Sequence, residues 1–203
     1  MRVRATGFLL TVALGACETN PGYSFLTLGV SQPLGTTRKF VSDVSWRNAA
    51  VDARMPFRGN FTSSVYVGWT LLHSETSNPV NFPQGAVSGL QFRDVHSLPM
   101  LFGAEYYPIP LRPDSVNSLR PYVGFLAGGY LIEQRTDLGL FTLIDDNWHA
   151  GFAPQLGFIA TYKGVRMLLD ARYNYAFPAG GGSYASSAYS YFGLNFGVAV
   201  GVY

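Results

Sequence analysis

The sequence predicts an all-β fold, a closed antiparallel eight-stranded transmembrane β-barrel. Charged residues make up 13% of the 203 residues, against about 25% in a typical soluble domain. Aromatic residues reach 15%, and there are 23 glycines. From residue 22 onward apolar and polar residues alternate with a period of two, which indicates strands. No stretch approaches the ~20 continuous apolar residues of a membrane helix, whereas a barrel crosses a membrane with strands of weak hydropathy.

Residues 1–16 have the features of a signal peptide, with two arginines ahead of a short apolar run. The run ends in Leu14-Gly15-Ala16-Cys17, which resembles a lipobox, the signal for lipid attachment to cysteine in bacterial lipoproteins. Two interpretations stay open: Cys17 carries a lipid, or cleavage occurs near Ala16 and Cys17 is incidental. Cys17 is the only cysteine, so an intrachain disulfide is excluded. Residues 17–21 then form a short N-terminal segment ahead of a barrel domain over 22–203.

Eight segments carry the alternation. In chain order they are 22–31, 44–56, 61–73, 95–107, 119–134, 147–162, 165–177 and 191–202. Segment 22–31 is ambiguous in register, whereas in the other seven the apolar residues share one face. Those faces carry Ala49, Val51, Ala53 and Met55; Phe61, Val65, Val67, Trp69 and Leu71; Leu98, Met100, Phe102 and Tyr106; Val123, Phe125 and Leu131; Trp148, Phe152, Leu156, Phe158 and Tyr162; Val165, Met167, Leu169, Ala171, Tyr173, Tyr175 and Phe177; and Phe192, Leu194, Phe196, Val198, Val200 and Val202. Most of the opposite positions are glycine, polar or charged, so each strand is expected to have one apolar face.

The connections between these strands differ in length. Arg58-Gly59-Asn60 and Lys163-Gly164 read as tight turns, and residues 108–118 form a Pro-rich turn. The other four connections are long and polar or Gly-rich: 32–43, 74–91, 135–146 and 178–186. Short turns at one end and long loops at the other are typical of outer-membrane barrels with both chain ends in the periplasm.

Two barrel classes fit this pattern, and the direction of the apolar faces separates them. A lipocalin-like soluble barrel would point its apolar residues into a ligand cavity. An eight-stranded barrel holds only a few layers of side chains or one small ligand, so this many large residues would not fit inside. Aromatic residues also lie near both ends of the strands, as girdles at the two membrane interfaces would: Phe57, Phe61, Tyr106, Tyr162, Trp69, Trp148, Tyr175 and Phe177. We therefore expect the apolar faces to meet lipid.

In this architecture, over 22–203, the chain resembles small outer-membrane barrels of the OmpA/OmpX/OmpW type. The final strand, which ends in Tyr203, is similar to the C-terminal aromatic signal that the barrel-assembly machinery reads. It departs from that signal in register, because Val198, Val200 and Val202 alternate out of step with Tyr203. The resemblance implies a cell outer-membrane location, with outer-membrane lipids, lipopolysaccharide and the assembly machinery as partners.

Six charged residues fall on the polar faces: Asp52, Arg54, Glu105, Arg166, Asp170 and Arg172. An unpaired charge in a narrow lumen would cost several kcal/mol, so a cluster of salt bridges is expected. Two interpretations follow, a neutral plug that fills the barrel or a charge-lined pore with a gate. The plug is favoured because small eight-stranded barrels are filled by side chains.

Catalytic chemistry has weak support. Some outer-membrane barrels deacylate lipid A, which needs a serine nucleophile and a histidine base. His73-Ser74-Glu75 and His96-Ser97 supply both residue types, but neighbours on a strand point to opposite faces. The three histidines and one cysteine have no metal-ligand spacing, and Gly180-Gly181-Gly182 lacks the lysine of a phosphate loop. We expect no catalytic residues, metal or cofactor.

The net charge of +2, without a basic cluster longer than two residues, argues against a nucleic-acid partner. The first functional hypothesis is a structural barrel whose long outer loops bind at the cell surface, because loops on a rigid scaffold carry contacts. The second is a narrow channel for small or apolar solutes, as resemblance to OmpW implies. A lipid A-modifying enzyme of the deacylase kind and a lipocalin-like binder are the remaining alternatives. The sequence names no extracellular ligand.

Overall fold

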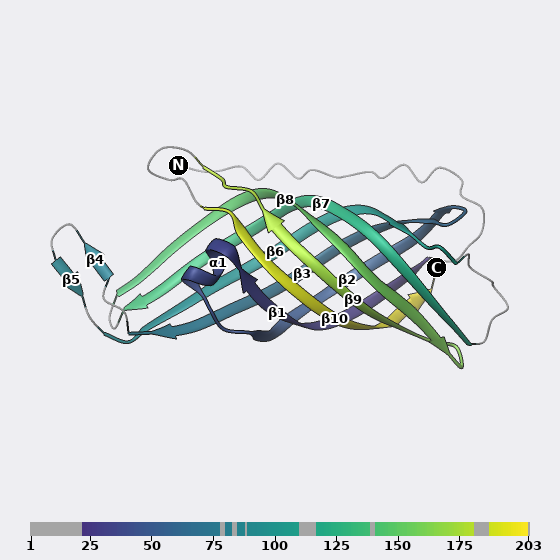
Figure 1. Cartoon of the computed structure of the whole chain (residues 1–203), viewed down its shortest axis with the longest axis horizontal. Coiled ribbons are helices and arrows are strands. Elements are labelled where there is room, and N and C mark those ends of the chain that lie inside the picture. Colours follow the sequence, from purple (N-terminus) through teal and green to yellow (C-terminus); the bar gives the residue numbers. More distant parts are fainter. Residues whose placement is uncertain are drawn as a thin grey trace, which may run out of the picture.

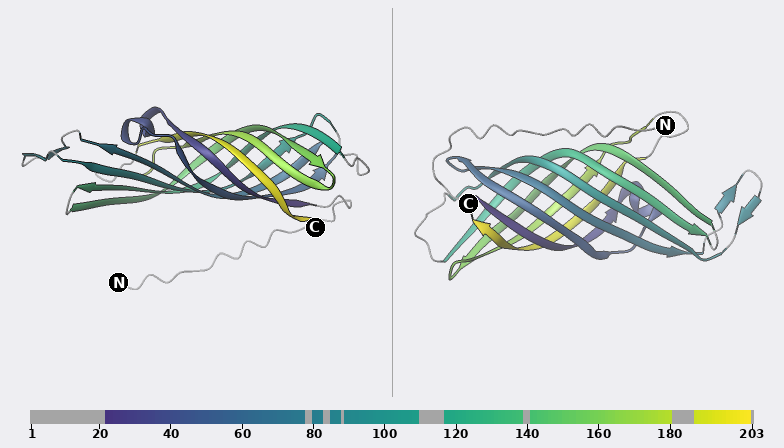
Figure 2. Two further views of the ribbon diagram at one scale, coloured as in Figure 1. Left: turned by 90° about the horizontal axis from the view of Figure 1, so that it is seen from below. Right: turned by 180° about the vertical axis from the view of Figure 1, so that it is seen from behind.

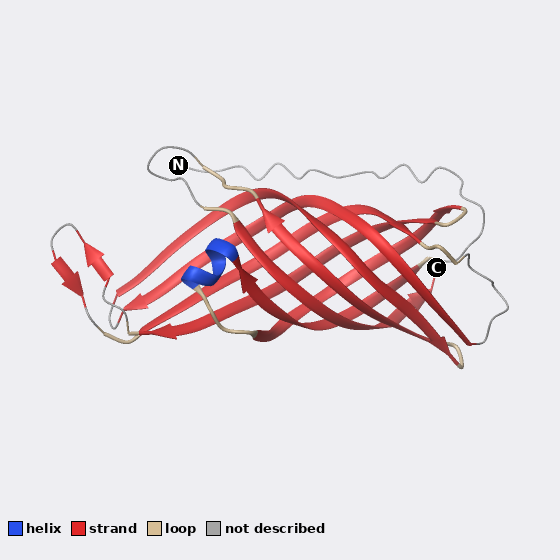
Figure 3. Cartoon of the chain, viewed as in Figure 1, coloured by secondary structure: helices blue, strands red, loops and turns tan. Residues whose placement is uncertain are grey.

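The computed structural model describes residues 22–77, 80–82, 85–87, 89–109, 117–138, 141–180 and 187–202. The predicted signal peptide, the 17–21 segment, Cys17 and the aromatic C-terminus Tyr203 lie outside these residues. Figures 1 and 3 show one long barrel of steeply inclined strands with a short helix at one end.

Eight strands close the barrel. They are β1 (Tyr23–Leu34), β2 (Ser45–Arg58), β3 (Phe61–Thr76), β6 (Gln91–Tyr106), β7 (Asn117–Leu138), β8 (Phe141–Tyr162), β9 (Val165–Ala176) and β10 (Tyr189–Val202). Each pairs antiparallel with its neighbours, and β1 pairs with both β2 and β10. The predicted closed, antiparallel, eight-stranded barrel is thus confirmed.

The two ends of the barrel differ. Tyr23 pairs with Val202, so the first and last strands meet at one end, which we call the terminal end. The tight turns at 59–60 and 163–164 also lie there, because they join β2 to β3 and β8 to β9. Lys163 and Gly164 both have positive φ, 48° and 86°, as the two central residues of a type I′ hairpin turn require. We call the opposite end the distal end.

Four strands continue past the distal rim of the barrel. Residues 73–76 of β3, 91–94 of β6, 135–138 of β7 and 141–144 of β8 pair side by side. The ladders that would flank them end earlier, at Leu71 for β2–β3 and at Gly151 for β8–β9. These sixteen residues form what we call the protruding sheet, which extends well beyond the helix in Figures 1 and 2.

The protruding sheet corrects one prediction from the sequence. Residues 135–146 were expected to form a long loop, but all described members of this range are strand, and β7 and β8 are joined through residues 139–140. Residues 141–146, the part of this range that belongs to β8, have exposed side chains on both faces of the strand. A strand that meets water on both sides needs no apolar–polar alternation, so the pattern that identified the other strands is missing here.

Two other expected loops contain small elements. The 32–43 connection holds helix α1 (Gly35–Phe40), and the 74–91 connection holds the paired strands β4 (Val80–Phe82) and β5 (Gly85–Val87). Helix α1 is short and lies against the distal ends of β1 and β10. No helix among the described residues is long and apolar enough to cross a membrane.

The apolar faces of the strands point outward. On β10, Phe192, Leu194, Phe196 and Val198 are exposed, while Tyr191 and Asn195 between them are buried. The same alternation holds along the other strands, and the expected girdle residues all lie on the outer surface. This distribution contradicts the lipocalin-like alternative, in which the interior would take the apolar faces.

A β-bulge changes one residue of the outer surface. The alternation of β2 would place Trp46 with the inward residues Asn48, Asp52 and Arg54. The pairing with β1 shifts by one residue beyond Asn48, and Trp46 is 79% exposed. A bulge reverses the side-chain direction beyond it, so Trp46 joins the distal aromatic residues.

Candidate functional site

The middle of the barrel lumen holds a network of buried ion pairs and hydrogen bonds centred on Arg54 of β2. Its guanidinium Nη2 lies 2.7 Å from Asp52 Oδ2, and its Nη1 lies 3.0 Å from Glu105 Oε2. The same two nitrogens donate to the hydroxyls of Tyr107 and Tyr122, at 3.0 and 2.9 Å. The side chains of Arg54, Asp52 and Glu105 are fully buried.

Arg172 of β9 forms the second centre. Its Nη2 lies 3.0 Å from Asp170 Oδ2 and 3.7 Å from Asp52 Oδ2, and its Nε donates to Gln155 Oε1 at 2.9 Å. The guanidinium lies 3.7 Å from the centre of the Tyr66 ring, a cation–π contact that also covers its flat face. Asp52 therefore links the two arginines.

Hydrogen bonds extend the network to every barrel strand. Ser64 of β3 donates to Asp52, Gln155 of β8 donates to Glu105, and Asn195 of β10 donates to Asp170. Asn48 of β2 donates to Asn195 and to Ser31 of β1. With Tyr122 of β7, all eight strands are connected through the lumen.

All six carboxylate oxygens of this lumen network have a donor. Asp52 receives from Ser64 and Arg54. Asp170 receives from Asn195 and Arg172. Glu105 receives from Gln155 at 2.7 Å and from Tyr107 at 2.6 Å. Buried carboxylates are stable only when paired and hydrogen-bonded, and these three meet that condition.

Five of the six residues expected from the sequence lie in the network, and Arg166 does not. Its guanidinium lies 4.9 Å from the centre of the Tyr23 ring near the terminal end, and its Nη1 is buried without a hydrogen-bond partner. Arg166 is two residues from the hairpin turn that precedes β9. It therefore lies nearer the terminal end than Asp170 and Arg172. The network thus has three carboxylates and two guanidiniums.

Sequence reasoning missed the neutral members of the network, above all Tyr107, Tyr122 and Tyr66. Tyrosine is common on both faces of barrel strands, so its position alone carries no signal. Gln155, Asn195 and Asn48 were detectable, because they fall on the same inward faces as the charges. Uncharged amides in a lumen lined by charges are the natural bridging groups, since each both donates and accepts.

Apolar layers lie on both sides of the lumen network. The distal layer includes Leu72, Val95, Leu101, Leu126 and Tyr130. The terminal layer contains Phe25, Ile159 and Leu168 among tyrosines. The inward leucines interrupt the expected polar faces, and all of those named here are at most 2% exposed.

Helix α1 closes the distal layer. Val41, directly after the helix, is fully buried in that layer, and Phe40 packs against it. Thr37 accepts a hydrogen bond from the backbone N–H of Ser190 at 2.8 Å, and the hydroxyl of Ser190 donates to the carbonyl of Leu34 at 3.1 Å. These contacts hold the helix over the mouth of the barrel between β1 and β10.

Comparisons with known proteins agree with this geometry. No family model matches the sequence, and no curated protein sequence matches it. Among solved structures, Neisserial surface protein A is 16% identical, with a TM-score of 0.57 over 88% of this chain and 96% of that chain. The chain has the fold of the small outer-membrane β-barrels. Weaker likenesses are to Ail of Yersinia pestis (12% identical, TM-score 0.46, 88% and 98% covered) and to AlkL, solved in lipid bilayers (16%, 0.45, 97% and 95%).

The two His–Ser pairs expected from the sequence, His73-Ser74 and His96-Ser97, are each divided by the wall of this outer-membrane barrel fold. His73 faces outward, where its Nδ1 lies 2.6 Å from Asp94 Oδ1, while Ser74 points inward to the carbonyl of Phe40. Ser97 is likewise buried in the lumen, whereas His96 stands beside Trp69 on the outer surface. Within the described part of the chain, no three His, Cys, Asp or Glu residues are arranged to hold a metal ion.

Among the described residues, no strand pairs with the outer edge of β8 in the protruding sheet, so this edge is open. Phe141 is 74% exposed, and Leu143 and Ile144 on opposite faces are 52% and 61% exposed. On its other side this part of β8 is held by β7. The Thr142 hydroxyl and the Arg135 guanidinium both bind Asp137, and together they lower the pKa of its carboxyl.

Proposed function

We propose that this protein is a closed barrel of the cell outer membrane that holds a binding surface, the protruding sheet, above the membrane. The observation that carries the proposal is the filled lumen. A polar network that joins all eight strands lies between two apolar layers, and a helix covers the distal mouth. Eight-stranded barrels leave room for little more than side chains, so a structural role is favoured over solute transport.

The outer surface supports the membrane location. Apolar side chains project from all eight strands between aromatic residues at both ends, which is the surface that lipid requires. The terminal end has the tight turns, the start of β1 and the end of β10, so we assign it to the periplasm. In this proposal, outer-membrane lipids and lipopolysaccharide surround the apolar outer surface of the barrel, and the barrel-assembly machinery inserts the chain.

The open edge of β8 supports the binding role. An unpaired edge strand offers backbone donors and acceptors to another extended chain, and partners commonly bind by adding a strand to such an edge. Exposed Phe141, Leu143 and Ile144 supply apolar contacts on both faces. A position above the membrane would leave this edge open to a partner at the cell surface.

Planar-bilayer recording of the refolded chain tests the closed barrel. Folding is first established by a heat-modifiable band on a gel, and a porin in the same lipid serves as the positive control. We expect the folded chain to insert without conductance steps. Reproducible steps from a folded sample would overturn the proposal and support the narrow channel, with Asp52, Arg54, Glu105, Asp170 and Arg172 as its lining.

Two further features of the proposal have their own tests. Lipid attachment at Cys17 predicts a mature mass above that of the chain from residue 17, and an unmodified mass would contradict it. We propose no enzymatic activity, since in both His–Ser pairs, His73-Ser74 and His96-Ser97, the histidine faces outward and the serine faces the lumen. Loss of acyl chains from lipid A in cells that make this protein would contradict that statement.

A further inference from the structure

Four side chains that can donate hydrogen bonds face the lumen at the terminal end of the barrel. The last inward row before the β8–β9 turn contains Ser118 of β7, Thr161 of β8 and Arg166 of β9, which pair side by side. Arg120 of β7 lies one row deeper, because it pairs with Ile159, two residues before Thr161 on the same face of β8. We call Ser118, Arg120, Thr161 and Arg166 the terminal cradle.

Arg120 is buried without a carboxylate partner in the described structure. It is 8% exposed, its Nε donates to the carbonyl of Ile109 at 3.3 Å, and its guanidinium lies 4.4 Å from the centre of the Tyr107 ring. These contacts leave the two Nη groups without an acceptor among the described residues. A buried charge needs a partner and hydrogen bonds, so the Nη groups favour an anion at this position.

Arg166 supplies the second guanidinium of the terminal cradle. Its Nη1 is buried without a hydrogen-bond partner, and its guanidinium lies 4.9 Å from the centre of the Tyr23 ring. The ring covers one flat face, whereas the N–H groups point out from the edge of the guanidinium plane. Tyr23 and Tyr107 belong to the same terminal apolar layer, so both guanidiniums rest against one layer of tyrosines.

The strand register brings the four donors together. Arg120 and Arg166 lie on either side of β8. Two interstrand spacings of about 4.8 Å and two residue rises of about 3.4 Å put their Cα atoms about 12 Å apart. Inward side chains converge in a closed barrel, so the guanidiniums can approach one ion from two sides. Ser118 and Thr161 complete the group from the wall between them.

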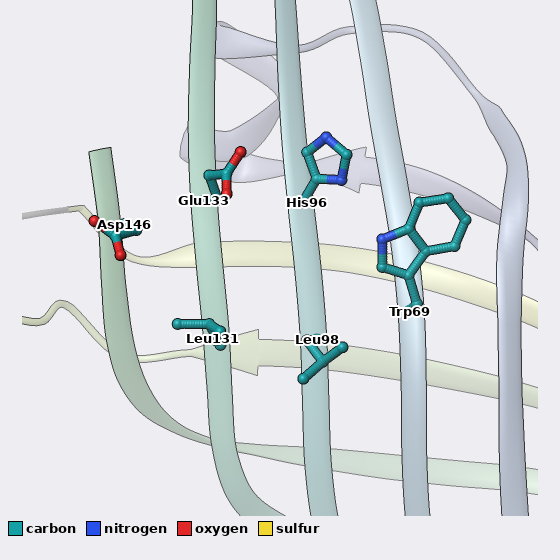
Figure 4. A pocket seen from close by; sticks show the side chains of 6 residues that line it. All are labelled: Trp69, His96, Leu98, Leu131, Glu133 and Asp146. Atoms are coloured by element: carbon teal, nitrogen blue, oxygen red, sulfur yellow. The ribbon is translucent and has the colours of Figure 1, made fainter. Parts of the chain in front are cut away.

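Acidic side chains are concentrated elsewhere in the described structure. Glu105 is separated from Arg120 by Tyr107, whose hydroxyl donates to Glu105 while its ring meets the guanidinium. At the distal end the charge has the opposite sign, since Glu133 and Asp146 lie side by side on neighbouring strands (Figure 4). The terminal cradle therefore has two positive charges and no described carboxylate beside them.

We propose that the terminal cradle binds a phosphate group, with both guanidiniums at its oxygens and the two hydroxyls as further donors. Guanidiniums bind phosphate through charge-assisted N–H bonds, and a tetrahedral oxyanion accepts donors from several sides at once. Assignment of the terminal end to the periplasm leaves two sources of this group, free phosphate and the headgroup of an inner-leaflet phospholipid. The site is separate from the protruding sheet and does not depend on its binding role.

Isothermal titration calorimetry with inorganic phosphate tests the site. The refolded full chain is titrated in dodecyl maltoside, a detergent without phosphate, at constant ionic strength. We expect saturable binding at one site per chain. Arg120→Gln with Arg166→Gln should weaken the affinity about tenfold or more, because both charge-assisted contacts are lost.

Lys163→Gln is the matched control for a lost positive charge at the same end. Lys163 lies outside the lumen, with its Nζ 5.3 Å from the centre of the exposed Tyr162 ring. An exposed charge is screened by salt, so this variant should keep the wild-type affinity within about twofold. An equal loss in Lys163→Gln and in the double arginine variant would indicate general charge attraction and overturn the proposal.

Two further measurements complete the test. In the ¹⁵N-labelled wild type, phosphate should shift the Nε–H resonances of Arg120 and Arg166 but not that of Arg135, which Asp137 holds at 2.9 Å; this readout needs no variant to fold. Native mass spectrometry with phosphatidylglycerol identifies the source, because a lipid headgroup would be retained by the wild type and lost from the double variant. A wild type that neither binds phosphate nor retains more lipid than the double variant would overturn the proposal.

Discussion

Arg54→Met removes the centre of the lumen network while keeping a long side chain in its place. Arg54 donates to Asp52, Tyr107 and Tyr122 and pairs with Glu105. Its removal leaves two buried carboxylates with fewer partners, and breaking a buried ion pair costs about 3–5 kcal/mol. Asp52 keeps Ser64 and Arg172, and Glu105 keeps Tyr107 and Gln155. We therefore expect a loss of about 3 kcal/mol, the low end of that range.

Urea titration of the barrel in lipid vesicles, followed by heat-modifiable migration, measures this loss. Arg166→Met is the matched control, because Arg166 lies over the Tyr23 ring and has no ion pair in the described structure. Its expected cost is about 1 kcal/mol, the size of a cation–π contact. Adding Glu105→Gln to Arg54→Met should recover part of the loss, because Glu105 has lost its guanidinium partner and the substitution makes it neutral. If Arg54→Met costs no more than Arg166→Met, the network does not stabilise the barrel as argued.

Three further pairs of substitutions, each a test and its control, examine the barrel wall and one of its turns. Val67→Arg, in the middle of the outward face of β3, should lower the free energy of unfolding in urea titrations by about 2–4 kcal/mol. Ser63→Arg, near the aromatic residues of the terminal end, should lower it by about 0–1 kcal/mol. Equal losses would mean that the lipid-facing surface lies elsewhere. Gly103→Ala should reduce the folded yield, because its Cβ would lie 2.0 Å from a carbonyl oxygen of β7, while Gly89→Ala meets nothing within 4 Å and should fold normally. Lys163→Val should destabilise the barrel, because Lys163 has a φ of 48°, where a β-branched residue is a far greater outlier than lysine; Lys163→Asn should match or exceed the wild type.

The barrel wall was predictable because lipid and lumen impose opposite requirements on alternate residues. Phe192, Leu194 and Phe196 could only face lipid, and Asp170 and Arg172 could only face each other inside. Seven strands could be placed with their faces from this pattern, and the first was placed without a register. The inward charges followed from the same alternation, which is why five of the six lie together.

The remaining features depend on tertiary context that alternation does not encode. Leu143 and Ile144 face water on opposite sides of the protruding sheet. This part of β8 therefore has no alternation of apolar and polar residues by which it could be predicted. Trp46 points outward because of a bulge, a one-residue shift that a repeat of two cannot show. Leu72 and Leu126 point inward because the distal lumen is apolar where helix α1 covers it. Arg166 could not be separated from Arg172, because the distance of a charge from the network depends on strand stagger.

The side-chain hydrogen bonds that reach across β1, from β2 to β10, have a consequence for assembly. Asn48 of β2 reaches Asn195 of β10 at 2.9 Å, and Asn195 holds Asp170 at 2.6 Å. Hairpins that enter the membrane singly would expose Asp52, Asp170 and Arg172 with their partners missing, and unpaired charges in lipid are costly. Partly built sheets are therefore penalised, and only joining β1 to β10 completes the set of bonds. The charged centre thus favours the closed barrel over an unfinished or misregistered one.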